Sequence, residues 1–140
     1  MELHQDCGLF IKQINDELRK NGNNALRSQG MTLTQLDALA ELDQAPEGQR
    51  SLKELEQILH VAQSTAAGIV ARLEQKGLVV GLGDAEDRRI KRVQITPAGV
   101  ECVRAALHHR AAAEEKLLSG LTETERDIFY TILKKVRESL

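Results

Sequence analysis

The stretch from Ser51 to Gly99 reads SLKELEQILHVAQSTAAGIVARLEQKGLVVGLGDAEDRRIKRVQITPAG, and its pattern decides the fold. Ser51 and Glu54 have the spacing of a capping box, in which two side chains satisfy backbone N–H groups at a helix start. Apolar residues then recur at helical spacing, at Leu52, Leu55, Ile58 and Leu59. Residues 60–63 have the length of the turn in a helix-turn-helix motif. The pattern therefore predicts two short helices joined by a tight turn.

The second half of the stretch predicts a hairpin and a further helix. Gly77, just past the second helix and followed by an apolar residue, is typical of a left-handed C-cap. Residues 78–82 have the composition of a strand, 83–90 form a charged loop, and 92–95 alternate polar and apolar side chains. Thr96, followed by proline, predicts the next helix start. A helix-turn-helix followed by a hairpin is a winged helix, so we expect a mainly α fold with a small β-hairpin wing.

Charge and aromatic content bear on what such a fold would bind. A winged helix places its second helix in a major groove of DNA and its hairpin against an adjacent minor groove. The net charge of −2 argues mildly against DNA, but four of five neighbouring wing positions are basic: Arg88, Arg89, Lys91 and Arg92. Only Phe10, Phe129 and Tyr130 are aromatic, and readers of single strands usually need aromatic stacking platforms. The composition therefore favours duplex DNA.

The wing resembles that of the MarR family of bacterial transcription regulators. In that family an Asp-x-Arg is followed by a short spacer, Val-x-Leu-Thr and a helix start that contains glycine. The corresponding segments here are Asp-Arg-Arg at 87–89, Val-Gln-Ile-Thr at 93–96 and Pro-Ala-Gly at 97–99. The helix end at 72–79 is similar too, and the flanking helices fit, so the resemblance covers essentially the whole chain. It implies one MarR-like domain over residues 1–140.

The resemblance also implies a DNA-binding region over residues 31–97 and roles for its side chains. Asp87 would orient Arg89, and Arg89 would enter the minor groove, whereas Arg88 either contacts phosphate or pairs with Glu86. Hydroxyls and N–H groups at a helix start can meet phosphate, and glutamine can read adenine. The residues expected to contact duplex DNA are Ser51, Gln63, Ser64, Thr65, Arg72, Arg88, Arg89, Lys91 and Arg92.

The second helix of the motif departs from the family pattern. Gln63 stands where arginine is common, and Ala62 replaces the usual serine or threonine cap. Residues 66–68, Ala-Ala-Gly, offer little side-chain readout. They indicate either close helix packing or close approach to the groove floor or a thymine methyl, and both interpretations stay open. His60, where the family has glycine, is expected to be structural because histidine tolerates a positive φ.

The terminal segments 3–29 and 100–140 carry apolar stripes too large for a small winged helix to cover. Gly22 and the asparagines after it predict a kink or break in the first segment. In the family these helices interdigitate between two subunits, which implies a C2 homodimer on a pseudo-palindromic operator. The resemblance also implies a small apolar or phenolic effector, in a cleft lined here by Phe10, Ile14 and Leu36.

The leading hypothesis is a sequence-specific transcription regulator, a repressor that a small-molecule effector releases from DNA. One alternative is a thiol redox switch at Cys7, because related hydroperoxide regulators carry a reactive cysteine nearby. A lone cysteine on an apolar stripe is more often a small core residue. Another alternative is a winged helix that binds protein and not DNA, which the acidic balance favours.

Other classes of protein find little support. No apolar run approaches the roughly 18 residues of a membrane span, and no secretory signal is evident, so a cytoplasmic protein without membrane contact is expected. Two cysteines do not make a disulfide framework. Nucleophile–base pairs, metal-ligand spacings and phosphate loops were not found, so we expect no enzyme, no cofactor and no metal.

Overall fold

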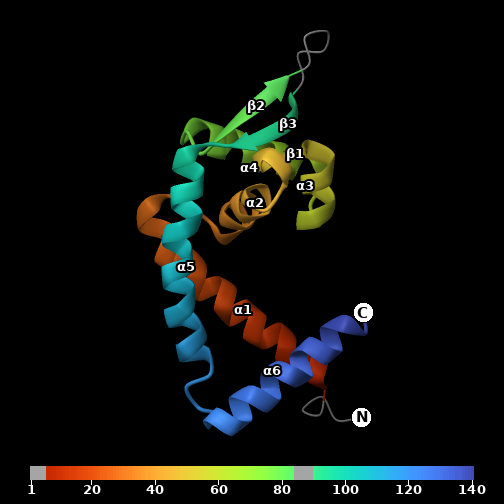
Figure 1. Ribbon diagram of the computed structural model, residues 1–140, viewed down its shortest axis with the longest axis vertical. Helices are drawn as coiled ribbons and strands as arrows, with labels where there is room; N and C mark the ends of the chain where they lie inside the picture. Colours follow the sequence, from red (N-terminus) through yellow and green to blue (C-terminus); the bar gives the residue numbers. More distant parts are fainter. Residues whose placement is uncertain (1–5, 84–89) are drawn as a thin grey trace. The chain divides into compact units, whose positions relative to one another are not determined.

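The computed structural model of the protein describes residues 6–83 and 90–140 (Figure 1). This part of the chain is mainly helical with one three-stranded antiparallel sheet, so the fold class expected from the sequence is confirmed. The chain divides into two compact units, the first ending at Val103 and the second spanning Arg104–Leu140. Among the described residues, no helix combines the length and apolar character needed to cross a membrane.

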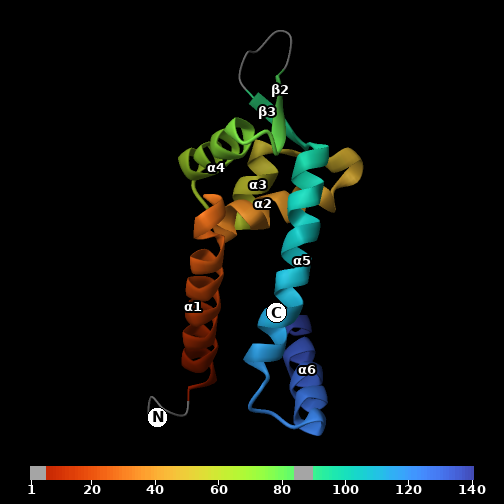
Figure 2. The ribbon, with the colours of Figure 1, turned by 90° about the vertical axis from the view of Figure 1, so that its left-hand side faces the viewer.

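The first unit holds the helix-turn-helix and the sheet. It contains α1 (Cys7–Leu26), α2 (Leu33–Asp43), β1 (Gln49–Ser51), α3 (Leu52–Leu59), α4 (Gln63–Gln75), β2 (Val79–Gly83), β3 (Ile90–Ile95) and the start of α5 (Pro97–Leu117). Strand β3 lies in the middle of the sheet and pairs with both β1 and β2. In Figures 1 and 2 the β2–β3 hairpin extends away from α2, α3 and α4.

Local sequence signals explain where the helices begin and end. Thr32 and Ser51 each form a complete capping box with the residue three positions later, which sets the starts of α2 and α3. His60 ends α3 at a φ of 54°, and Gly77 follows α4 at a φ of 72°. The structural role of His60 and the glycine cap are therefore confirmed. The turn between α3 and α4 spans residues 60–62, one residue fewer than expected, because Gln63 already begins α4.

The core of the first unit joins α2, α3, α4 and the sheet. Its largest fully buried side chains are Leu39, Leu42, Leu55, Leu73, Val79 and Val93. Burying a side chain of this size stabilises the fold by about 1.5–3 kcal/mol. Because Val79 and Val93 come from the two hairpin strands, the same core that packs the three helices also anchors the base of the wing.

Two expectations about the first unit need correction. Helix α1 shows no break at Gly22 and runs unbroken to Leu26. A Cβ at Gly22 would lie 2.6 Å from a methyl carbon of Leu33, and the Asn23 side chain accepts a hydrogen bond of 2.8 Å from the Leu33 N–H. These residues therefore serve the packing of α1 on α2. Strand β1 was not expected either, because three polar residues that end in the first residue of a capping box carry no strand signal.

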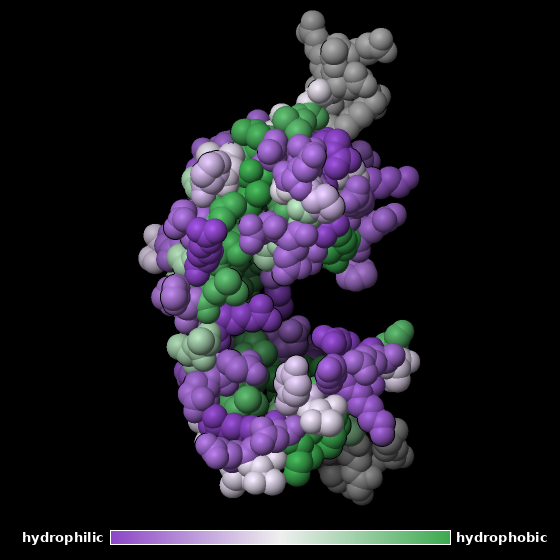
Figure 3. Space-filling model, viewed as in Figure 1, coloured by the Kyte–Doolittle hydropathy of each residue, from purple (hydrophilic) through white to green (hydrophobic). Residues whose placement is uncertain are grey.

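The second unit contains the rest of α5 and the helix α6 (Glu123–Glu138). Thr122 and Glu125 form a complete capping box at the start of α6, and Arg126 binds both carboxylate oxygens of Glu115 at 3.0 Å. Large apolar side chains of this unit are exposed: Leu107, Leu117, Ile128, Tyr130, Ile132, Leu133, Val136 and Leu140. Figure 3 shows hydrophobic residues at the surface among hydrophilic ones on the face it presents. The described chain alone thus leaves apolar surface uncovered.

Candidate nucleic-acid interface

The start of α4 presents three polar residues to solvent. Gln63, Ser64 and Thr65 form its first turn and are all exposed. Ala62 occupies the N-cap and offers no side-chain oxygen to the N–H groups of that turn. These backbone donors and the positive end of the helix dipole therefore face a surface where an anion can approach.

The Ala-Ala-Gly segment in the middle of α4 is interpreted either as close helix packing or as close approach to DNA, and the exposure of its residues bears on that choice. Ala66 is 1% exposed and belongs to the core, whereas Ala67 and Gly68 are exposed. A Cβ added at Gly68 would meet nothing within 4 Å. Close packing therefore explains Ala66 alone. The exposed face of α4 carries only a methyl group at Ala67 and no side chain at Gly68. Arg72 is exposed on the same face as Gly68, one turn further along.

The sheet brings the start of α3 beside the base of the wing. Ser51 of β1 pairs with Arg92 of β3, and the Arg92 Nε–H donates a hydrogen bond of 3.4 Å to the side-chain oxygen of Gln49. Arg92 is exposed, so its guanidinium is held at the surface next to the first residues of α3. Two predicted contacts that are 41 positions apart in the sequence thus lie together.

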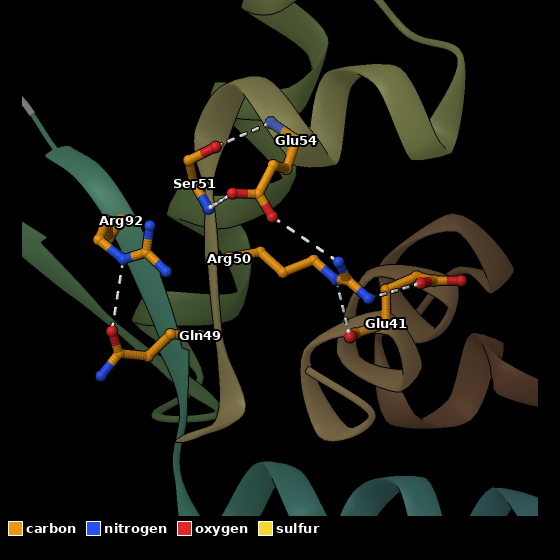
Figure 4. A network of polar contacts seen from close by, with 6 residues as sticks. All are labelled: Glu41, Gln49, Arg50, Ser51, Glu54 and Arg92. Carbon is orange, nitrogen blue, oxygen red and sulfur yellow. Dashed lines mark hydrogen bonds and ion pairs between the residues drawn. The ribbon is translucent and has the colours of Figure 1, made fainter. Parts of the chain in front are cut away.

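The Ser51 hydroxyl is part of the α3 capping box. It accepts the Glu54 N–H at 3.0 Å, while the Ser51 N–H donates to the Glu54 carboxylate at 3.4 Å (Figure 4). These hydrogen bonds from Ser51, together with the charges of Arg92 and Arg50, hold the pKa of Glu54 below its ordinary value. Glu54 is therefore a charged carboxylate at neutral pH, within the field of both arginines.

Arg50 and Gln49, which the sequence did not single out, organise this region. Figure 4 shows Arg50 reaching from β1 toward α2, on the side of the strand away from Arg92. The Arg50 Nε–H donates to the Glu41 backbone carbonyl at 3.0 Å, and the guanidinium lies 3.5 Å from the Glu41 carboxylate. The only sequence signal for these roles is the proximity of Gln-Arg to a capping box, which is too general to predict them.

Asp87, Arg88 and Arg89 lie outside the described residues, as does the side chain of Lys91. The backbone of Lys91 belongs to β3.

The remaining candidate residues lie on α1 and α2. Cys7 is the first residue of α1 and is exposed, and Phe10 and Ile14 are 49% and 42% exposed on the same helix. Leu36 is half-buried in α2. Burial raises the pKa of Cys102, so this second thiol is a weak nucleophile at neutral pH. Among the described residues, no three histidine, cysteine or acidic side chains lie close enough to hold a metal ion.

Comparison with known proteins shows what this arrangement is similar to. A family model described as the MarR family matches residues 29–90. Transcriptional repressor MprA of Escherichia coli (strain K12) is 28% identical over 127 residues, which cover 91% of this chain and 72% of MprA. The HTH-type transcriptional repressor MdtR of Bacillus subtilis (strain 168) is 28% identical over 124 residues, which cover 89% of this chain and 79% of MdtR.

A solved structure agrees with the sequence matches. The reduced form of MarR from E. coli has a TM-score of 0.82 at 25% identity, over 94% of this chain and 96% of that one. The family model covers α2, α3, α4 and β2 and ends at Ile90, the first residue of β3. The repressor relatives align over most of their length, and the fold is shared. Residues 29–90 of this chain therefore match the MarR family, and the chain shares the winged helix-turn-helix fold of MarR.

Proposed function

We propose that the protein is a transcription regulator that binds duplex DNA as a repressor. The observation that carries the proposal is the placement of polar and basic groups along one motif. The uncapped first turn of α4, the exposed Arg72 and the Arg92 guanidinium beside Ser51 all belong to the helix-turn-helix and wing base. MprA and MdtR, both named as repressors, support the direction of regulation.

The proposed contacts divide into three kinds. The exposed face of α4 would read the major groove through Gln63. Its small residues Ala67 and Gly68 would let the helix approach base edges closely. Ser51, Ser64, Thr65, Arg72, Arg88, Lys91 and Arg92 would contact phosphate, which positions the protein without reading sequence. Arg89, oriented by Asp87, would enter the minor groove and read its width.

A C2 homodimer is part of the proposal. The described helices leave α1 and α6 each with exposed apolar side chains, and a second copy of the chain would cover such surfaces. The residues assigned to this interface are 3–29 and 100–140. Two winged helices related by a two-fold axis would bind a pseudo-palindromic operator.

Release by a small apolar or phenolic molecule is the regulatory step that we propose. Phe10 and Ile14 lie one turn apart on α1, and their exposed apolar surface suits an aromatic ligand. Leu36 of α2 would form another wall. A panel of phenols and aromatic acids, added to the protein–DNA complex, tests this step: at least one should release DNA, and Phe10→Ala should weaken its effect.

The central test is selection of duplex DNA from a random pool, followed by titration with variants. Arg89→Ala should weaken operator binding by about 1–3 kcal/mol, the range for a specific arginine contact. Lys91→Ala should weaken all sequences alike and reduce the salt slope by about one unit. Lys76→Ala is the matched control, because Lys76 is exposed and lies outside both the predicted DNA contacts and the predicted dimer interface.

Two results would contradict the proposal. If the parent protein enriches no duplex from the pool, a protein-binding winged helix becomes the better hypothesis. If Arg89→Ala binds like the parent across the salt range, the wing is an ordinary surface hairpin.

A further inference from the structure

The side chain of Arg50 is held on the inner face of the sheet. Arg50 pairs directly with Val93, and Val93 is fully buried, so both side chains lie on the face that packs against the helices. Only 22% of the Arg50 side chain is exposed. Its guanidinium contacts α2 through Glu41 and the start of α3 through the Glu54 carboxylate, at 3.7 Å. One arginine therefore joins β1, α2 and α3.

Glu54 is the carboxylate that Arg50 contacts at the start of α3. Its side chain is 46% exposed, and the capping box fixes it beside Ser51 at the start of α3. Ser51 of the same capping box pairs across the sheet with Arg92, and the Arg50 guanidinium lies 3.7 Å from the Glu54 carboxylate, so this carboxylate lies near both arginines. Without Arg50, this carboxylate would repel a nearby phosphate and attract the Arg92 guanidinium away from it.

We propose that Arg50 is a positioning residue for DNA binding: it neutralises the Glu54 carboxylate, so that Arg92 remains available to a DNA phosphate. The inference rests on the proposed function, because it assigns Arg50 to the same interface. Arg50 itself touches no DNA in this account. Its hydrogen bond to the Glu41 carbonyl and its contact with the Glu41 carboxylate hold the guanidinium in place on the inner face.

A double-mutant cycle separates this role from simple support of the fold. Arg50→Met removes the charge while keeping much of the apolar stem. Glu54→Gln removes the opposing charge but keeps the capping box, since glutamine serves the third position as well as glutamate. Affinity is measured for the parent, both single variants and the double variant, on a duplex selected by the parent protein at low salt. The urea midpoint of each variant is measured alongside.

We expect Arg50→Met to weaken binding about fivefold, the effect of one unit charge at short range in a water-like medium. Glu54→Gln should restore the double variant to within about twofold of the parent, the usual limit of additivity. In the parent background Glu54→Gln should change affinity much less. Glu41→Gln combined with Arg50→Met is the control, and it should restore nothing, because Glu41 lies on the α2 side of Arg50.

The outcomes distinguish the inference from the proposed function. If the parent selects a duplex but Glu54→Gln has the same effect in both backgrounds, Arg50 is structural only and the inference is overturned. An Arg50→Met variant that binds like the parent also overturns it. If Arg50→Met does not fold, Arg50→Gln completes the same cycle. A parent protein that selects no duplex removes the proposed function itself.

Discussion

Gly99 offers a sharp test of how the wing base is packed. It is buried in the first turn of α5, and a Cβ at this position would clash with the backbone oxygen of Leu78. It would also lie 2.6 Å from Cγ1 and 3.3 Å from Cδ1 of Ile95. The Leu78 oxygen already accepts the Thr96 N–H at 3.0 Å, so it cannot shift without loss of that bond. Gly99→Ala should therefore destabilise the protein.

The size of the effect follows from two opposing contributions. Alanine gains up to about 1 kcal/mol over glycine inside a helix. Overpacking in a well-packed core typically costs about 1–3 kcal/mol, and a clash with anchored backbone belongs at or above the upper end. A net destabilisation of about 2 kcal/mol is expected, or a Tm lower by roughly 6 °C for a chain of this size.

Gly68→Ala is the matched control, because it is the same substitution in an exposed helix interior. A Cβ there meets nothing within 4 Å, so the variant should be about 0.5–1 kcal/mol more stable than the parent. Urea unfolding followed by far-UV circular dichroism measures both, at one protein concentration because association adds to apparent stability. A Gly99→Ala protein as stable as the parent would refute this account of the wing base.

Three further predictions concern assembly, thiol chemistry and pH. Deleting residues 121–140 should give insoluble or unfolded protein, and a soluble folded monomer in light scattering would contradict the dimer interface. Cys7→Ser should leave DNA binding in the presence of peroxide unchanged; loss of binding that occurs only with Cys7 present would instead favour the redox alternative. Hydrogen bonds from the Thr122 backbone and side chain hold the pKa of Glu125 below its ordinary 4.5. The resulting contribution to the free energy of unfolding is present above about pH 4.5 and is lost as the pH falls through the lowered pKa. The free energy of unfolding of Glu125→Gln, measured by urea unfolding at several pH values, should therefore fall less steeply with acid than that of the parent.

The helices and their ends were predictable because their signals are local. A capping box, a glycine at a left-handed position or a proline after threonine acts within one turn of chain, so the starts of α2, α3, α5 and α6 could be predicted from a few residues each. The winged-helix order follows from these boundaries and from the change from helical to strand periodicity.

What only the tertiary structure decided depends on residues far apart in sequence. Gly22 carries a helix-breaking signal, yet α1 continues through it because Leu33 of α2 fills the space a side chain would need. Ala66 and Ala67 are identical in sequence terms, and only packing places the first in the core and the second on the outer face of α4.

The site shows the same division. Ser51, Gln63, Ser64, Thr65, Arg72 and Arg92 were expected at the interface from local pattern and family resemblance. Arg50 was not, because nothing local reveals that β1 pairs with β3 and that Arg50 therefore turns inward to Glu41 and Glu54. Local hydrogen bonds determine where an element starts, whereas the partner of a half-buried charge such as Arg50 is determined by which elements the hydrophobic core brings together.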